Sequence, residues 1–165
     1  MPVAGKYLDA MSEETRAFVA RTEQFSPDDN PPFTLDQQRA SYNELCKAFH
    51  AGYPSGISAE DHEIGSSHSL KVRVYRKTGS DPAVTLVYLH GGGFVLGGLE
   101  SHDDICAELC DQTGFCVVSV DYRLAPEHPF PADLEDALAG HRWALATIGH
   151  PIIVCGDSAG ACLAA

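Results

Sequence analysis

Continuous apolar runs alternate with amphipathic stretches in the second half of the chain. The runs at 84–89, 115–120 and 151–155 lack the polar alternation of a strand that faces water on one side, so they predict buried parallel strands. Helical periodicity separates them, first from about Ser101 and then over 132–147. Strands that alternate with helices predict right-handed crossovers and a mostly parallel sheet with helices on both faces, which is an α/β fold.

Both of these helices are expected to turn an apolar face toward the sheet. The first is predicted to begin with a capping box, because Ser101 and Asp104 have the Ser-x-x-Glu spacing with Asp in place of Glu. The residues expected to face inward are Ile105, Cys106 and Leu109 in the first helix, and Leu134, Ala137, Leu138, His141 and Leu145 in the second.

The chain before residue 56 shows helical periodicity and loops instead of apolar runs. One helix is predicted after Ser12, a proline-rich break follows at 26–32, and a second helix is predicted over 35–49. We therefore expect an N-terminal helical segment at 1–55 and an α/β unit at 56–165.

The α/β unit is expected to open with a half-exposed strand. Apolar and polar residues alternate over 70–76, and the segment around 62–64 is placed to pair with this strand in the antiparallel direction. Neither an internal repeat nor a low-complexity tract interrupts the chain.

Composition narrows the class of partner. The 165 residues include 11 Lys and Arg against 23 Asp and Glu, for a formal net charge of −12. Nucleic acid and anionic membranes reward clustered positive charge, so neither is expected as the main partner. Because there is no apolar signal segment at the start and no apolar stretch of about 18 residues, we expect a cytoplasmic chain without a membrane span.

Six cysteines are expected to be reduced and buried rather than paired in disulfides. His102, Cys106 and Cys110 stand four residues apart and would share a helix face that could hold a metal ion. A fourth ligand is missing from this ladder, and cysteine is among the most buried residue types. We therefore expect core-facing thiols and no metal site.

The third apolar run leads directly into Gly156-Asp157-Ser158-Ala159-Gly160, a G-x-S-x-G pattern. A serine on a sharp turn between a strand and a helix is exposed at the carboxyl end of the sheet, and glycines on both sides avoid collisions with the strand and the helix. The N-terminus of the helix would stabilise negative charge on an attacked ester carbonyl. The pattern alone is weak, because it arises by chance in roughly one chain in ten of this size.

A second glycine-rich motif, His90-Gly91-Gly92-Gly93-Phe94, follows the first apolar run. Three glycines after a strand let the backbone approach a ligand and direct N–H groups at an oxyanion. Each motif stands in the context that its chemistry requires. Together they indicate acyl transfer through a serine nucleophile.

With these motifs, the chain resembles the hormone-sensitive-lipase-like family of α/β-hydrolases, and within it the bacterial acetyl esterases. The resemblance extends from about Glu60 to the last residue and includes, besides the two glycine motifs, Asp121-Tyr122-Arg123-Leu124-Ala125-Pro126-Glu127 and Phe130-Pro131-Ala132. It implies an α/β-hydrolase fold in which 1–55 is the cap segment and 56–165 is the N-terminal half of the catalytic domain.

The resemblance also assigns roles to individual residues. Ser158 would be the nucleophile, and the oxyanion hole would consist of the backbone N–H groups of Gly92, Gly93 and Ala159. His90 and Gly91 would shape the oxyanion loop. No metal or organic cofactor is implied.

Further residues near the motifs are expected to support the fold. Arg123 and Glu127 would form a charge pair that holds the loop after the second apolar run. Asp157 is expected to brace the turn rather than to serve as the catalytic acid, and Trp143 is expected to pack in the core. Of the eight histidines, all except His90 are expected on the surface or on helix faces.

In this family the nucleophile is followed by Asp or Glu and then by His, whereas only seven residues follow Ser158 here. We therefore expect the N-terminal half of an esterase, either a truncated product or a polypeptide that needs a second chain, and expect the chain alone to be inactive. The strand at 151–155 would keep an exposed edge, which invites aggregation or pairing with another chain, including a second copy.

The leading hypothesis is a carboxylic-ester hydrolase for acetyl or other short-chain esters that acts through an acyl-enzyme, with a small-molecule ester as its partner. The alternatives are a non-catalytic small-molecule binder or an inactive remnant on the same scaffold, or an amide hydrolase or deacetylase that uses the same nucleophile and oxyanion hole.

Overall fold

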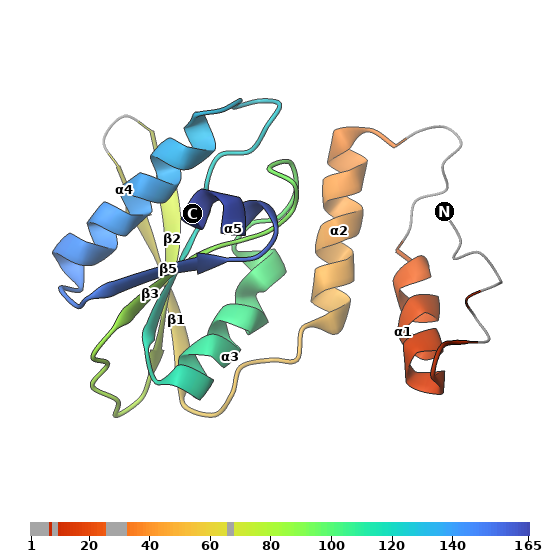
Figure 1. The fold of residues 1–165 in the computed structure, drawn as a ribbon, viewed down its shortest axis with the longest axis horizontal. Helices are drawn as coiled ribbons and strands as arrows, with labels where there is room; N and C mark the ends of the chain where they lie inside the picture. The colour runs from red at the N-terminus through yellow and green to blue at the C-terminus, as the bar shows by residue number, and fades with distance from the viewer. Residues whose placement is uncertain (1–6, 8–9, 26–32, 66–67) are drawn as a thin grey trace.

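A five-stranded sheet forms the centre of the computed structural model, which describes residues 7, 10–25, 33–65 and 68–165 (Figure 1). The strand order is β1-β2-β4-β3-β5. β2 runs antiparallel to β1 and β4, whereas β3 runs parallel to β4 and β5. The strands are β1 (Ile57–Ile64), β2 (Leu70–Lys77), β3 (Thr85–Leu89), β4 (Cys116–Val120) and β5 (Ile152–Gly156). The predicted α/β sheet and its antiparallel opening strands are confirmed.

Helices cover both faces of this sheet, as predicted. They are α3 (Asp103–Thr113), which follows the 3₁₀ turn η2 (Glu100–His102), α4 (Ala132–Thr147) and the short α5 (Ala159–Ala164). Successive residues of a strand point to opposite faces, so neighbouring side chains join different cores. Val118 of β4 lies in the core under α4 with Ala137, while Val117 lies in the core under α3 with Cys106.

The N-terminal part consists of α1 (Glu13–Glu23) and α2 (Leu35–Phe49), which lie side by side next to the α/β unit (Figure 1). Ser12 caps α1, and Thr34 and Gln37 form a capping box at the start of α2. The rings of Phe18 and Phe49 pack with centroids 5.2 Å apart and join the two helices. Both helices are confirmed, whereas the break predicted at 26–32 lies outside the described residues.

The predicted start of α3 is wrong. Ser101 lies in the η2 turn, where its hydroxyl donates to the Gly98 carbonyl, and α3 begins at Asp103 without a side-chain cap. Cys106 is buried, but Ile105 is 44% exposed and faces away from the sheet.

The predicted inner face of α4 is also partly wrong. Ala137 is buried as expected, but Leu138 and Leu145 are 44% and 51% exposed. A Cβ at Gly140 would lie 2.6 Å from Val120, so this helix approaches the sheet too closely for a large side chain at the contact. Small residues therefore form the inner face of α4, and Leu138 and Leu145 point outward.

β5 is only partly buried, so the expectation of a third buried strand is wrong, whereas the exposed edge expected for this strand is confirmed. It pairs with β3 on one side and ends the sheet on the other, and Ile153 is 48% exposed. The position at the sheet edge explains why a continuous apolar run is not a buried strand here.

All six cysteines are free thiols in the structure. Cys106, Cys110 and Cys116 are buried, but Cys162 is exposed, contrary to the expectation of burial. Over the described ranges no cluster of side chains could hold a metal ion. In the same part of the chain, no helix has the length and apolar character needed to cross a bilayer.

Candidate active site

Ser158 occupies a strained turn between β5 and α5. Its backbone has φ 50° and ψ −114°, a combination that residues with side chains rarely adopt, and its side chain is exposed. A Cβ at Gly156 or Gly160 would collide with the Leu89 carbonyl oxygen of the neighbouring strand. The two glycines of the motif are thus required by the close approach of β3 to the turn, which presents Ser158 at the carboxyl end of the sheet.

Asp157 braces this turn from the side of β3. Its Oδ1 accepts hydrogen bonds from the Gly91 backbone N–H and the Tyr88 hydroxyl, both at 2.8 Å, and lies 3.3 Å from Nε2 of His102. Burial opposes ionisation of Asp157, but the hydrogen bond from Tyr88, the charge of His102 and the Gly91 N–H outweigh it and hold the pKa below its usual value. The carboxylate therefore stays ionised and accepts these bonds.

His90 is fully buried at the start of the loop after β3 (residues 90–97), which is the predicted oxyanion loop. Its ring stacks on Tyr122 with centroids 4.1 Å apart, and Tyr122 donates from its hydroxyl to the His90 carbonyl at 2.5 Å. Burial lowers the pKa of His90 to about 4, so the ring is neutral near pH 7. Nδ1 donates to the Gly91 carbonyl at 2.7 Å, which makes Nε2 the unprotonated nitrogen.

Hydrogen bonds inside the loop orient its peptide groups. The Gly92 carbonyl accepts from the N–H groups of Val95 (3.1 Å) and Leu96 (2.9 Å). In a trans peptide the carbonyl and the following N–H point in opposite directions, so the Gly93 N–H points away from these partners. Gly92 and Gly93 have φ of 124° and 63°, and a Cβ at Gly92 would collide with the Leu96 carbonyl.

Ala159 is the first residue of α5, where a helix leaves its backbone N–H without an internal partner. Within the described segments, no hydrogen bond uses the N–H of Gly92, Gly93 or Ala159. All three predicted oxyanion donors are therefore available to a ligand.

An apolar pocket of about 500 Å³ begins at the oxyanion loop and ends at α5. Its lining residues are Gly93, Phe94, Ala125, His128, Phe130, Asp133, Leu134, Cys162 and Leu163. The sequence pattern does not predict these residues as a group, because they come from three separate stretches of the chain. Phe130, which is 76% exposed, is one of two aromatic rings at this pocket.

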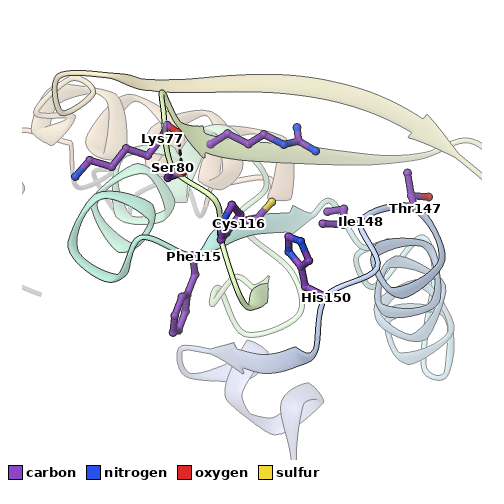
Figure 2. A pocket seen from close by; sticks show the side chains of 9 residues that line it. Lys77, Ser80, Phe115, Cys116, Thr147, Ile148 and His150 are labelled. Atoms are coloured by element: carbon purple, nitrogen blue, oxygen red, sulfur yellow. Dashed lines mark hydrogen bonds between the residues drawn. The ribbon is translucent and has the colours of Figure 1, made fainter.

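A second cavity, of about 340 Å³, lies at the opposite end of the sheet (Figure 2). Cys116 and His150, which line it, stand at the starts of parallel strands, whereas Ser158 follows the end of one. Because none of its lining residues belongs to the serine turn or the oxyanion loop, we assign this cavity no part in the chemistry of Ser158.

The predicted charge pair between Arg123 and Glu127 is wrong. Arg123 binds Asp136 of α4, with Nε 2.8 Å from one carboxylate oxygen, and Glu127 binds Arg39 of α2, with 2.8 Å between the charged groups. Asp136 is fully buried, so its charge needs a close partner more than the exposed Glu127 does.

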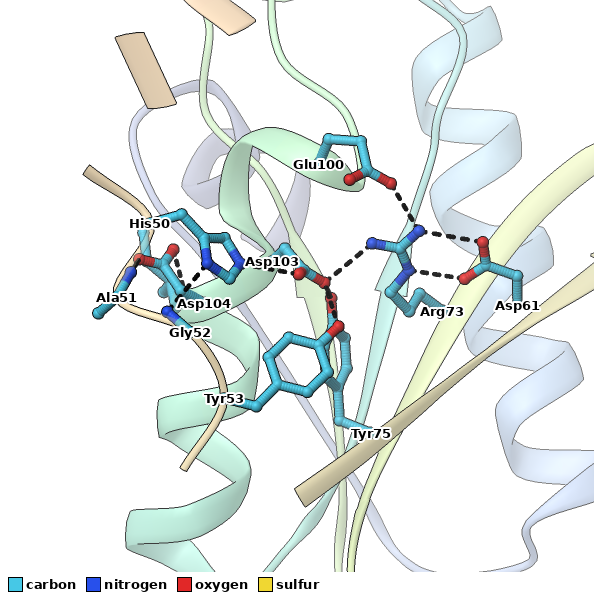
Figure 3. Close-up of polar contacts among 11 residues, drawn as sticks. His50, Ala51, Gly52, Tyr53, Asp61, Arg73, Tyr75, Glu100, Asp103 and Asp104 are labelled. Atoms are coloured by element: carbon cyan, nitrogen blue, oxygen red, sulfur yellow. Dashed lines mark hydrogen bonds and ion pairs between the residues drawn. The ribbon is translucent and has the colours of Figure 1, made fainter. Parts of the chain in front are cut away.

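The buried side chain of Asp103 joins α3 to the segment after α2 (Figure 3). It accepts hydrogen bonds from His50 (2.9 Å), Tyr53 (2.8 Å), Arg73 (2.9 Å) and Tyr75 (2.8 Å). Burial would raise the pKa of Asp103, but these donors outweigh it and lower the pKa. This cluster was not predicted from the sequence, although the run of four polar residues at 101–104 before an amphipathic helix is a signal for it.

Several histidines are less exposed than predicted. His102 is 4% exposed and contacts Asp157, while His50 and His68 bind the carboxylates of Asp103 and Asp136. Trp143 packs against the core and against His62, as expected. In the part of the chain that the structure describes, no histidine is hydrogen-bonded to Ser158.

Comparison with known proteins gives the same picture. Residues 86–165 match the family described as alpha/beta hydrolase fold. The chain is 40% identical over 140 residues to ethyl acetate hydrolase of Pseudomonas putida, which covers 78% of this chain and 44% of that protein. It is 38% identical over 133 residues to an acetyl-hydrolase of Streptomyces hygroscopicus, which covers 79% of this chain and 42% of that protein.

Solved structures agree with these relatives. A hyperthermophilic esterase from the archaeon Pyrobaculum calidifontis superposes with a TM-score of 0.79 and 35% identity over 93% of this chain and 51% of its own. An esterase from the bacterial hormone-sensitive lipase family superposes with a TM-score of 0.79 and is 30% identical in sequence. The match covers 93% of this chain and 50% of that esterase. The chain thus spans about half the length of these esterases. It belongs to the α/β-hydrolase fold family, in the branch that resembles hormone-sensitive lipase.

Proposed function

We propose that this chain carries the nucleophile and the oxyanion hole of a carboxylic-ester hydrolase that acts through a serine acyl-enzyme. The observation that carries the proposal is the hydrogen bond that the Gly91 N–H donates to Asp157, which joins the serine turn to the oxyanion loop. Strain at Ser158 and unpartnered N–H groups at Gly93 and Ala159 support it, because they are what acyl transfer requires at these places.

In the proposed reaction, the Ser158 hydroxyl attacks the ester carbonyl and a new bond forms between its oxygen and the carbonyl carbon. The negative oxygen of the tetrahedral intermediate accepts hydrogen bonds from Gly92, Gly93 and Ala159. The serine proton passes to a base and from it to the departing alcohol, which leaves the acyl-enzyme. Water then attacks the acyl-enzyme and releases the acid. No histidine in the described segments is hydrogen-bonded to the Ser158 hydroxyl, so none of them is assigned as this base.

The apolar pocket of about 500 Å³ next to Gly93 supports esters with short acyl chains and small alcohols as substrates. Ethyl acetate hydrolase and acetyl-hydrolase, two relatives of the chain, carry names that agree with this class. We also propose that the helical segment at 1–55 acts as a cap beside this site.

A chimera tests the proposal. Residues 1–165 would replace the matching part of ethyl acetate hydrolase of Pseudomonas putida, and hydrolysis of nitrophenyl acetate would be compared with that of the Ser158→Ala version. We expect a serine-dependent rate, with a loss of about 10³-fold or more in the variant. Hydrolysis of nitroacetanilide, the amide counterpart of nitrophenyl acetate, would be measured in parallel and would distinguish a preference for amides from a preference for esters.

Equal rates for a folded chimera and its Ser158→Ala version would overturn the proposal. Because a junction of this kind can prevent folding, a second chimera would exchange only residues 86–165, the part that matches the family. Circular dichroism and a cooperative thermal transition would show which chimera is folded.

A further inference from the structure

Arg39 lies on α2 but donates hydrogen bonds to two segments of the α/β unit. Its Nε donates to the Val95 carbonyl at 2.9 Å, and one terminal nitrogen donates to the Ala125 carbonyl at 3.0 Å. Both terminal nitrogens donate to the carboxylate of Glu127, each at 2.8 Å. One guanidinium thus joins α2, the oxyanion loop and the segment after β4.

The planar fork of arginine suits this arrangement. Two parallel bonds to Glu127 fix the plane of the guanidinium, which leaves Nε directed at Val95. Arg39 holds the pKa of Glu127 at about 2, so the pair stays ionised across the neutral range. A lysine keeps the charge but has a single nitrogen, which cannot serve Glu127 and both carbonyls together.

The contact at Val95 leads directly to the proposed oxyanion donors. The N–H of Val95 donates to the Gly92 carbonyl, and that carbonyl sets the direction of the Gly93 N–H. The preceding carbonyl, of Phe94, accepts from the Ala125 N–H at 2.9 Å. Arg39 therefore binds the Val95 and Ala125 carbonyls on either side of this backbone hydrogen bond, which joins the loop to the segment after β4.

We propose that Arg39 is a positioning residue, which acts through Val95 to hold the oxyanion loop in the orientation that directs the Gly93 N–H at the substrate. α2 then contributes to catalysis through the loop, in addition to covering the site. The inference rests on the proposed function, because the orientation of the loop matters only if the loop receives an oxyanion.

Amide hydrogen exchange of the chain tests the positioning without any activity. We expect Arg39→Ala to raise exchange in peptides that cover residues 91–97 by about tenfold, while peptides from β3 and β4 keep their protection. Arg39→Lys should resemble Arg39→Ala, because the fork and not the charge is needed. Lys47→Ala is the matched control, since Lys47 is an exposed cation of the same helix whose nearest acid, Glu44, is 3.9 Å away.

Unchanged exchange at 91–97 in the Arg39→Ala chain would overturn the inference. So would a uniform rise across the whole sheet, because that result indicates general destabilisation.

Kinetics of the esterase chimera separate this inference from the proposed function. Arg39→Ala should lower kcat by about tenfold or more with KM changed less than threefold, and Arg39→Lys should not restore it. A parent chimera without serine-dependent activity would count against the proposed function, and the exchange result would still decide whether Arg39 positions the loop. A loss confined to KM would overturn the inference, because it would place Arg39 in substrate binding instead.

Discussion

The backbone N–H of Gly91 donates to Oδ1 of Asp157 at 2.8 Å, so the predicted oxyanion loop is bonded directly to the residue that precedes Ser158. A Cβ at Gly91 would collide with this carboxylate, which explains why a glycine stands at the contact. Because Gly91 follows β3 and Asp157 follows the parallel strand β5, one side chain sets the distance between two separate loops. Asp157, the acid next to Ser158, therefore has an architectural role.

Replacement of Asp157 should loosen this contact. Asp157→Ala leaves the Gly91 N–H and the Tyr88 hydroxyl without their acceptor, so we expect the free energy of unfolding to fall by about 2 kcal/mol. Asp157→Asn keeps one acceptor oxygen and should cost about 1 kcal/mol. Urea denaturation measures both, with Tyr88→Phe as a control that removes a single bond. Equal stability of the Asp157→Ala and wild-type chains would contradict the role we assign to Asp157.

Replacement of Asp103 should reduce stability more than replacement of Asp157, because Asp103 attaches the N-terminal segment to the α/β unit. Asp103→Ala removes the acceptor shared by His50, Arg73 and Tyr75, and we expect a loss of about 3 kcal/mol in the free energy of unfolding. Asp104→Ala is the matched control at the next position, because the bond that Asp104 accepts from this segment, from the Ala51 N–H, is a long one of 3.4 Å, and the change should cost less than about 1 kcal/mol.

Urea denaturation of the two variants gives the comparison, and limited proteolysis within 50–53 should become faster in Asp103→Ala alone. Similar losses of stability in the two variants would show that Asp103 has no special role in attaching this segment.

The elements of the α/β unit could be predicted because their signals are local. Continuous apolar runs and helical periodicity require only neighbouring residues, and the range predicted for α4, 132–147, is the one that the structure gives. The two glycine motifs were equally local. They were placed after the strands that the structure shows as β3 and β5. Parallel strands end at the same edge of a sheet, so both motifs lie at that edge.

The errors concern contacts between distant segments. Arg39 and Glu127 are 88 residues apart, and nothing in either neighbourhood identifies the partner, so Glu127 was paired with the nearby Arg123. The inner face of α4 was missed for a similar reason. The pattern suggested that its leucines are buried, but the distance to the sheet is set by Gly140 against Val120.

His90 predicts a specific dependence of stability on pH. Its pKa is lowered to about 4 in the folded chain from an ordinary value of 6.5, because its buried ring disfavours the charged form. Below pH 6.5 the unfolded chain takes up the proton first, so this contribution to stability is complete above pH 6.5 and is lost as the pH falls toward 4. The loss should reach about 3 kcal/mol.

Nuclear magnetic resonance of the imidazole C–H groups tests this directly. The signals of His90, assigned with a His90→Gln variant, should titrate near pH 4, and the variant should lose stability less steeply between pH 6.5 and 4. A titration of His90 above pH 6 would show that the ring is not held neutral by burial.

Strain at Ser158 predicts that the site reduces the stability of the fold. The φ of 50° and ψ of −114° cost about 1–3 kcal/mol for a residue with a Cβ, whereas glycine adopts them readily. Glycine also makes the unfolded chain more flexible, which offsets roughly 0.5–1 kcal/mol of the gain.

We therefore expect Ser158→Gly to be more stable than the wild type by about 1 kcal/mol, and Ser158→Ala, which keeps the Cβ, to match the wild type. Thermal denaturation should show a rise of about 2–4 °C for Ser158→Gly alone. If Ser158→Gly is no more stable than Ser158→Ala, the turn is not strained by the side chain, and the glycines around it are needed only for the close approach of β3.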